Sequence, residues 1–217
     1  MSAATPTPAK APAKVAAELP PAAAAQACLR TAEELEKKGF DEDAIGHYER
    51  ARHLDPKLPD ISPRLAALYA RCGDDRGALA EFEKARKLSP NDPDLLNDLG
   101  YFHTGRGDFA AAERCLREVV RLKPDYVRGW TNLGVVCAKT GRTDESRKAF
   151  ARAMTPAQAE YNLGVLLAGQ GRTDEGRACL RAAAALDPQF QQAADALKRL
   201  DTPAADKTTA AVAELGR

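Results

Sequence analysis

The chain has 217 residues, with 32 basic and 31 acidic side chains and a formal net charge of +1. Because the two signs are interleaved, no broad electropositive surface is expected, which disfavours nucleic acid as a partner. No stretch approaches the roughly 18 consecutive apolar residues of a membrane-spanning helix, and no signal-like apolar run follows the first residues. Neither a membrane nor export is predicted, and the expected location is the cytoplasm.

The first segment, residues 1–21, consists largely of alanine, proline, threonine and lysine. Such a composition offers too little apolar surface to offset the entropy lost when a chain becomes ordered. We expect this segment to be a disordered leader that precedes an array spanning residues 22–201.

From residue 25 the sequence repeats itself with a period of 34. Small residues, prolines and glycines keep this step: Ala44, Ala78 and Ala112; Pro56, Pro90 and Pro124; Gly39, Gly73, Gly107 and Gly141. Apolar residues within the period have helical spacing, so each unit is a helical supersecondary structure copied along the chain. Five repeats are predicted, at about 25–58, 59–92, 93–126, 127–156 and 157–190.

Each repeat is predicted to be a helical hairpin. A glycine near its middle separates two stretches of helical length, as a glycine that ends a helix in the left-handed conformation does. The second stretch ends before a proline in four repeats, because proline disfavours helix at the residue before it. A small residue in the second helix is followed one turn later by a large one, which indicates close helix packing at Ala44, Ala78, Ala112, Ser146 and Gly176.

Two repeats are irregular. Pro63 fits only in the first turn of a helix, so the second hairpin should begin late, with Ser62 as its N-cap. The fourth repeat is four residues short between Ala153 and Tyr161, about one helical turn. Thr155 to Gln158 has the pattern of a capping box. The loss should therefore fall on the preceding helix, with a local change in superhelix pitch.

The end of the chain contains one more amphipathic stretch. Phe190, Ala193, Ala194, Leu197 and Leu200 form an apolar stripe among polar residues. A stacked array needs such a helix to cover its last apolar face. We predict a capping helix at 191–201 and a flexible tail at 202–217.

These residues together resemble the tetratricopeptide repeat, or TPR. The fourth repeat shows the pattern best, with Trp130, Leu133-Gly134, Gly141, Phe150 and Ala153. The resemblance implies an all-α TPR solenoid, a right-handed superhelix of antiparallel helix pairs. It also implies that the first helices line a concave groove for a peptide or partner protein.

The resemblance places groove residues at fixed positions of each first helix. The sixth position holds Arg30, Arg64, Asp98, Asn132 and Asn162. Asn132 and Asn162, with Asn97, resemble an asparagine ladder that holds the backbone of an extended peptide, although asparagine before Leu-Gly also belongs to the repeat pattern itself. Arg128 and Tyr161 lie beside them. The carboxylate clamp of the chaperone-binding branch is not matched, since Leu29 and Glu33 stand at its first positions.

No catalytic or cofactor pattern is present, so no enzyme activity, cofactor or metal site is predicted. His47 and His53 are six residues apart, which does not place two metal ligands on one helical face. The five cysteines have no metal-ligand or redox spacing and are interpreted as buried thiols in a reducing compartment.

The leading hypothesis is a non-catalytic adaptor or scaffold that binds a peptide or helix of a partner protein in its groove. Two alternatives remain at this stage. One is an assembly factor of a larger machine, of the pilus or secretion type, acting through its convex face or by self-association. The other is a regulatory subunit of a separate enzyme. The sequence leaves the oligomeric state and the partner open.

Overall fold

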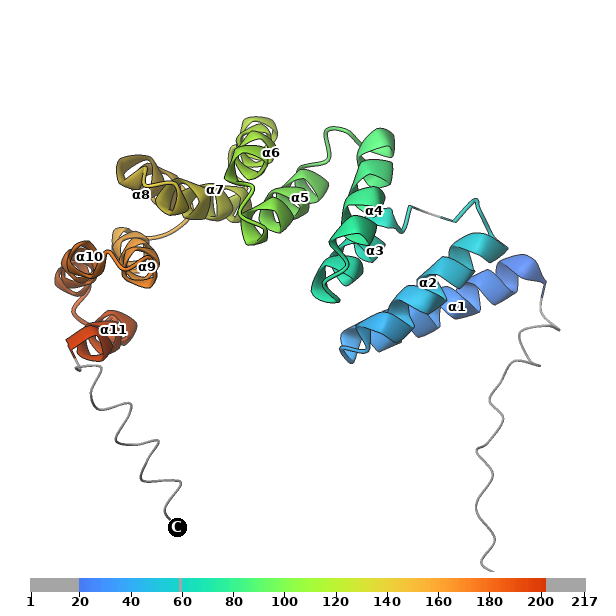
Figure 1. Cartoon of the computed structure of the whole chain (residues 1–217), viewed down its shortest axis with the longest axis horizontal. Helices are drawn as coiled ribbons and strands as arrows, with labels where there is room; N and C mark the ends of the chain where they lie inside the picture. Colours follow the sequence, from blue (N-terminus) through green and yellow to red (C-terminus); the bar gives the residue numbers. More distant parts are fainter. Residues whose placement is uncertain (1–19, 59, 202–217) are drawn as a thin grey trace, which may run out of the picture. The chain divides into compact units, whose positions relative to one another are not determined.

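The computed structural model describes residues 20–58 and 60–201, and nearly all of the predicted leader and tail lies outside them. This part of the chain contains eleven helices and no strand (Figure 1), which confirms an all-α fold. In chain order the helices are α1 (Pro21–Lys37), α2 (Asp41–Leu54), α3 (Ser62–Arg71), α4 (Asp75–Leu88), α5 (Pro93–Gly105), α6 (Phe109–Leu122), α7 (Val127–Lys139), α8 (Thr143–Phe150), α9 (Pro156–Gly169), α10 (Thr173–Leu186) and α11 (Gln191–Asp201).

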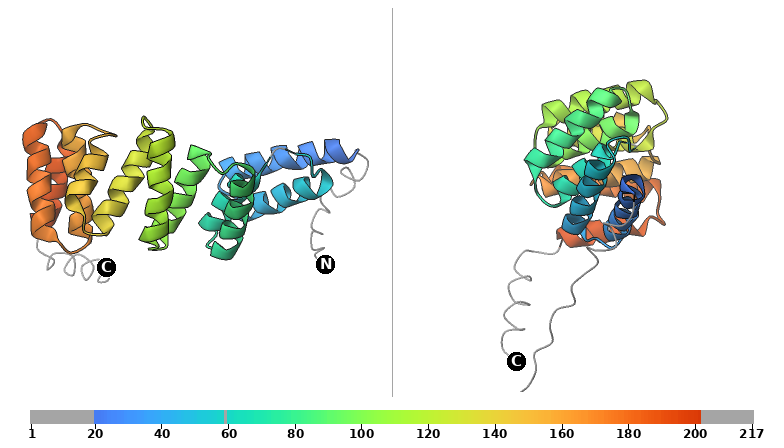
Figure 2. Two further views of the ribbon diagram at one scale, coloured as in Figure 1. Left: turned by 90° about the horizontal axis from the view of Figure 1, so that it is seen from above. Right: turned by 90° about the vertical axis from the view of Figure 1, so that its right-hand side faces the viewer.

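The helices form two compact units, Met1–Pro90 with α1 to α4 and Asn91–Arg217 with α5 to α11. Within each unit, consecutive helices pair as antiparallel hairpins: α1 with α2, α3 with α4, α5 with α6, α7 with α8, and α9 with α10. Helix α11 packs on α10, and Figure 2 shows these orange and red helices side by side with α9. Each of the five predicted repeats thus contains one hairpin.

The turn inside every hairpin is built in the same way. Its glycine has a φ between 77° and 81°, at Gly39, Gly73, Gly107, Gly141 and Gly171. In the first hairpin, Phe40 N–H donates to Leu35 O over 3.0 Å and Gly39 N–H donates to Glu36 O over 3.0 Å. This is the Schellman pattern, which satisfies the last carbonyls of a helix. The predicted helix-ending role of these glycines is confirmed.

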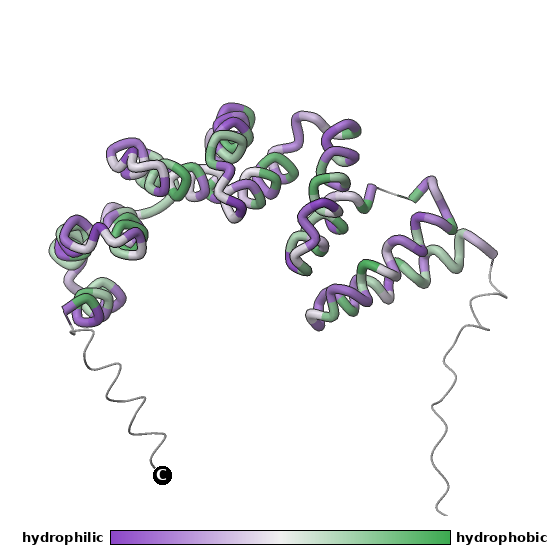
Figure 3. Tube along the Cα trace, in the orientation of Figure 1, coloured by the Kyte–Doolittle hydropathy of each residue, from purple (hydrophilic) through white to green (hydrophobic). Residues whose placement is uncertain are grey.

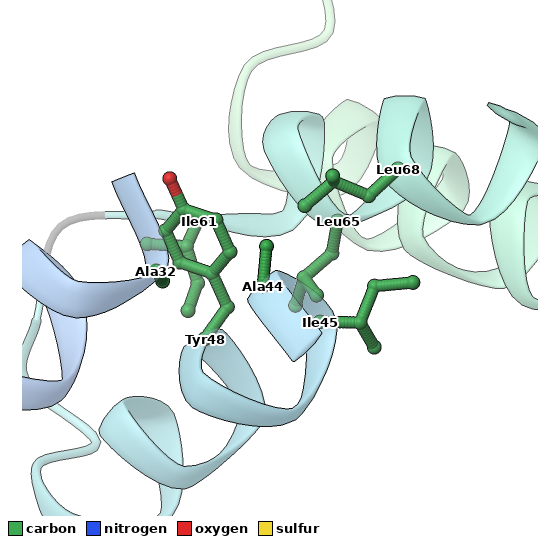
Figure 4. Packing of buried hydrophobic residues seen from close by; sticks show 7 residues of the cluster. All are labelled: Ala32, Ala44, Ile45, Tyr48, Ile61, Leu65 and Leu68. Carbon is green, nitrogen blue, oxygen red and sulfur yellow. The ribbon is translucent and has the colours of Figure 1, made fainter. Parts of the chain in front are cut away.

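The interior of a hairpin consists of small residues facing large ones. In the first unit Ala32 and Ala44 are fully buried beside Tyr48, and the same cluster includes Ile61, Leu65 and Leu68 of the next hairpin (Figure 4). In the second unit, a Cβ built on Gly134 would lie 2.6 Å from the Phe150 ring. Figure 3 shows apolar and polar residues alternating along the helices of both units, as expected when one stripe of each helix faces a core.

The first hairpins depart from the regular pattern at their amino-terminal ends. Helix α1 begins at Pro21, ahead of the predicted repeat start at residue 25, because Pro21 fits the first turn and the alanines that follow favour helix. Helix α3 begins late, as predicted, with Pro63 in its first turn, and it has only 10 residues. The prediction that Ser62 caps this helix is wrong. Ser62 lies inside the helix, is buried, and its N–H donates to Asp60 Oδ1 over 2.9 Å.

Helix α8 bears the loss of the four missing residues. It has 8 residues, whereas α2, α4, α6 and α10 have 14 each. The following helix begins with the predicted capping box, in which Thr155 Oγ1 accepts from Gln158 N–H and Gln158 Oε1 accepts from Thr155 N–H. The deletion therefore shortens the second helix and leaves the start of the next hairpin intact. The predicted change in pitch stays a prediction.

Ion pairs connect the second helix of one hairpin with the next hairpin of the same unit. In the first unit, Arg52 on α2 forms two hydrogen bonds with the buried Glu81 on α4, at 2.7 and 3.2 Å. In the second unit, Glu113 on α6 accepts from Arg142 over 2.8 and 2.6 Å and from Arg117 over 2.7 Å. Paired arginine–carboxylate contacts of this kind are stronger and more directional than simple surface pairs.

A close backbone contact between α9 and α10 predicts the effect of adding one methyl group at Gly176. A Cβ built on Gly176 would lie 2.7 Å from Gly164 O and 2.8 Å from Ala168 N, both backbone atoms. We expect Gly176→Ala to lower the free energy of unfolding by about 1–3 kcal/mol, because the helices must separate. The matched control, Gly46→Ala, meets nothing within 4 Å and should raise stability by about 0.5–1 kcal/mol. Urea unfolding followed by circular dichroism measures both, and equal effects would refute the close contact.

The ion pair of Glu113 predicts a pH dependence. Hydrogen bonds from Arg142, more than those from Arg117, lower the pKa of Glu113 from 4.5 to about 2. The stabilisation is therefore complete above pH 4.5 and is lost as the pH falls toward 2. Glu113→Gln should destabilise the chain by about 1–2 kcal/mol at pH 7 and flatten the acid limb of stability against pH. Glu118→Gln on the same helix removes only an exposed contact with Arg121 and should leave both properties unchanged.

Candidate functional site

The candidate site is the face of α5, α7 and α9 that points away from the second helices of the same unit. The glycine at the eighth position of each helix faces its partner: Gly100 faces Leu116, Gly134 faces Phe150, and Gly164 faces Leu180. The sixth position is about 200° around the helix from the eighth, so it lies on the opposite face. The predicted residues Asp98, Asn132 and Asn162 occupy this position, and we call them the polar row.

A second row runs beside the polar row and was not identified from the sequence. Residues three positions further along each helix share the same face. They are Tyr101, Val135 and Val165, which we call the apolar row. Tyr101 is 68% exposed and Val165 is 44% exposed, while Val135 is half-buried. The only signal in the sequence was the ninth position of the repeat, which carries an apolar residue in all three helices.

The polar row is tied together by a buried asparagine. Asn132 Nδ2 donates to Asn97 Oδ1 over 2.9 Å, and Asn97 Nδ2 donates to Asp98 Oδ1 over 3.2 Å. The side chain of Asn97 is fully buried. The prediction that Asn97 contacts a peptide is therefore wrong, because this residue packs between α5 and α7 with its amide satisfied by neighbouring residues. It positions Asn132, whose carbonyl oxygen has no donor among the described residues.

Arg128 extends this network to the amino-terminal end of α7. Its Nη2 donates to Asp98 Oδ1 over 3.0 Å, and its Nη1 lies 3.4 Å from the Tyr126 hydroxyl. That hydroxyl donates in turn to Asp94 on α5. Burial, followed by the hydrogen bond to Asp94, raises the pKa of Tyr126 to about 12. The predicted residues Asn97, Asp98, Arg128 and Asn132 thus form one hydrogen-bonded group across two hairpins.

Asn162 and Tyr161 continue the face on α9 and have different surroundings. Asn162 Nδ2 lies 2.9 Å from the sulfur of Met154, in the turn that follows the shortened α8. Tyr161 stacks edge-on against Phe190 with ring centroids 5.2 Å apart. Sulfur is a weak acceptor, so the amide of Asn162 is held less firmly than that of Asn132.

A hollow lies at the end of the apolar row. It has a volume of about 210 Å³ and lies between α9 and α11, lined by Tyr161, Val165, Ala168, Leu180, Ala196, Arg199 and Leu200. Its walls are apolar apart from the arginine. A hollow of this size suits one apolar side chain of a bound segment, not a whole small-molecule ligand.

The predicted residues of the first unit, Arg30 and Arg64, differ from those of the second unit in their ion pairs. Arg64 donates to the Tyr48 hydroxyl over 3.0 Å and lies 3.6 Å from both Glu33 and Glu36. Burial is the main cause that raises the pKa of Tyr48 to about 12. Arg64 is therefore already neutralised by its own hairpins, whereas Arg30 is exposed and has no ion pair within the described residues. A carboxylate ligand would have to compete for Arg64.

Residues 20–58 and 60–201 contain no group of three or more His, Cys, Asp or Glu side chains arranged to hold a metal ion. None of the helices in these ranges is both long enough and apolar enough to cross a membrane. None of the five cysteines forms a disulfide within the described residues. Cys28, Cys137 and Cys179 are buried as predicted, but Cys72 at the end of α3 is exposed, so the prediction of buried thiols is wrong for that residue.

Antiparallel helix pairs joined by glycine turns and closed by a capping helix define an α-helical repeat protein. Residues 98–160 and 157–190 match two family models, each described as a tetratricopeptide repeat. The helical repeat architecture of the described residues fits a multi-repeat TPR protein, and the fold is the all-α TPR fold. Proteins of this class are generally non-catalytic modules that mediate contacts between proteins. A search of curated proteins gave no match.

Several solved structures share the fold. YrrB, described as a TPR protein with an unusual peptide-binding site, has a TM-score of 0.58 and 24% identity over 79% of this chain and 90% of its own. A TPR protein from Parabacteroides merdae ATCC 43184 has a TM-score of 0.66 and 14% identity over 81% and 72%. MamA from Desulfovibrio magneticus RS-1 has a TM-score of 0.63 and 17% identity over 76% and 96%. At these identities the likeness concerns the fold alone.

The buried position of Asn97 predicts a structural effect. Asn97→Ala removes the acceptor of the Asn132 amide between two helices, which should lower the free energy of unfolding by about 1–3 kcal/mol. Asn132→Ala removes a half-exposed amide and should have a smaller effect. Urea midpoints of both variants test this order, and an equal or reversed order would show that Asn97 does not hold the network together.

Proposed function

We propose that this chain is a non-catalytic adaptor that binds an extended segment or a helix of a partner protein along α5, α7 and α9. The observation that carries the proposal is the pairing of the polar row with the apolar row. A bound segment can place apolar side chains on Tyr101 and Val165 while Asn132 and Asn162 bond to its backbone. Exposed apolar side chains in a row of this kind mark interaction surfaces.

The chemistry of the face restricts the partner. Asp98 and Arg128 neutralise each other, so the polar row has no strong net charge to select an acidic or a basic segment. An asparagine side chain both donates and accepts, which suits a peptide backbone of any sequence. Selectivity would then come from apolar side chains that fit against Val165 and into the hollow beside Tyr161. The expected partner is an uncharged segment with apolar residues at regular intervals.

The peptide-binding site in the description of YrrB supports a peptide ligand for a protein of this fold. It does not identify the residues used here, because the likeness is one of fold. The proposal therefore depends on the two rows of this chain.

The proposal is tested with peptides selected on the intact wild-type chain from a random displayed library. Their affinity is then measured by fluorescence anisotropy on two variants. Tyr101→Ala with Val165→Asp should weaken binding at least about tenfold, because the anchors of the segment are lost. Asn132→Ala with Asn162→Ala should weaken it less and similarly for all selected peptides.

The control is Leu88→Ala, which truncates a side chain that is 68% exposed but lies at the end of α4, outside the two rows. It should leave affinity unchanged. Circular dichroism confirms that helicity is retained in every variant. Selected peptides that bind the row variants and wild type equally would rule out this face as the binding site.

A further inference from the structure

Met154 lies in the turn that follows the shortened α8 and connects an apolar cluster with the polar row. It is half-buried and packs against buried residues of α7, α8, α9 and α10, which are Ala138, Phe150, Ala159, Leu163, Leu167 and Cys179. On its other side, its sulfur accepts a hydrogen bond from Asn162 Nδ2 over 2.9 Å. The chemical state of this sulfur therefore bears directly on a residue of the candidate binding face.

The two asparagines of the polar row are held by acceptors of different strength. Asn132 Nδ2 donates to the amide oxygen of Asn97 over 2.9 Å. Asn162 Nδ2 meets a thioether, which is a weak acceptor, and the side chain of Asn162 has no other hydrogen bond within residues 20–58 and 60–201. A stronger acceptor in the place of this sulfur would fix Asn162 as firmly as Asn132 is fixed.

Oxidation of Met154 supplies such an acceptor. In the reaction with hydrogen peroxide, the sulfur gives an electron pair to one peroxide oxygen and the O–O bond breaks. That oxygen stays on the sulfur, and the other leaves as water with both protons. The product, methionine sulfoxide, is polar, and dedicated reductases restore the thioether. The new oxygen is bonded to the atom that Asn162 Nδ2 already approaches.

The position of Asn162 determines whether the sulfoxide is tolerated. A polar oxygen against an apolar cluster destabilises a fold when it has no hydrogen-bond donor. Arg152, in the same turn, is engaged elsewhere, because its guanidinium lies 5.4 Å from the centre of the Trp130 ring. Asn162 Nδ2 is already in contact with the sulfur, so it can donate to the new oxygen without a rearrangement of α9.

We propose that Met154 is a reversible oxidation site for peroxides and that Asn162 binds its sulfoxide. Oxidation converts the weak contact of the Asn162 amide into a full hydrogen bond. A segment bound along the polar row must then compete with the sulfoxide for this amide. The effect on binding rests on the proposed function, whereas the pairing of the sulfoxide with Asn162 does not.

The test compares the thioether and sulfoxide forms of the full-length chain in the wild type and in Asn162→Ala. Both are treated with hydrogen peroxide, and peptide mapping by mass spectrometry separates oxidation at Met154 from oxidation at Met1, the other methionine of the chain. All samples carry Cys72→Ser, because Cys72 is an exposed thiol that peroxide also oxidises. Urea unfolding followed by circular dichroism gives the folding equilibrium constant of each form.

We expect oxidation to lower the folding equilibrium constant at least about fivefold more in Asn162→Ala than in the wild type, because the variant offers no amide to the sulfoxide. An equal loss in the two chains would overturn the pairing. Absence of oxidation at Met154 in the folded chain, at a peroxide dose that oxidises free methionine, would overturn the site itself.

The matched control is Met154→Leu, which keeps an apolar side chain of similar volume but has no sulfur. Peroxide should leave its stability unchanged. A loss equal to that of the wild type would assign the effect to another residue and would overturn the proposal.

The effect on binding is measured with the peptides selected on the wild-type chain. Their affinity for the sulfoxide form should be about fivefold lower than for the thioether form, and this difference should disappear in Asn162→Ala. Equal affinity for both forms would overturn the competition for the amide. Failure to select any peptide would count against the proposed function alone, because the stability comparison is made without peptide.

Discussion

The structure depends on one steric constraint, the close approach of the two helices within each hairpin. At the crossing point one helix carries glycine or alanine and the other carries alanine, serine or glycine. In the first unit Ala32 and Ala66 take the place that glycine holds in the second unit, and both are fully buried. Where Ser146 occupies the crossing, its hydroxyl donates to Gly134 O over 2.8 Å, so even the polar choice is satisfied inside the hairpin. Where the two helices approach closely, a large residue one turn further along the second helix fills the space between them.

The same constraint determines which side chains are free for binding. Since the eighth position of a first helix must face its partner, the sixth position of α5, α7 and α9 lies on the opposite face, and the ninth lies about 100° from the eighth, at the side of the helix. The exposed members of the two rows are therefore a by-product of hairpin packing, and the fold constrains their chemistry less than that of Val135, which packs against a buried cluster. Asn97 shows the limit of this freedom, because the fifth position lies close to the neighbouring hairpin and is buried there.

Much of the fold was predictable because it depends on local rules repeated five times. Glycines such as Gly141, prolines such as Pro124 and the capping box at Thr155 act within a few residues, and the period aligns them. The site was less predictable. Whether Asn97 is exposed or buried depends on packing between α5 and α7, and whether Arg64 is available depends on Tyr48 and two glutamates from other helices. The repeat pattern gives the residue type at each position but not the distances between side chains of different helices. The predicted capping role of Ser62 was wrong for the same reason, because the Ser62 N–H donates to the side chain of Asp60 and the helix already includes Ser62.

The shortened α8 also bears on how the array opens. Repeats in a stacked protein interact with their nearest neighbours, so stability is a sum of hairpin terms and interface terms. An interface that lacks a turn of its second helix contributes less, and the cooperativity of unfolding should weaken at that boundary. Hydrogen exchange in the native state would then divide the second unit at Phe150, with α9 to α11 opening as a separate foldon. The loss of four residues would thus determine at which boundary the second unit first unfolds.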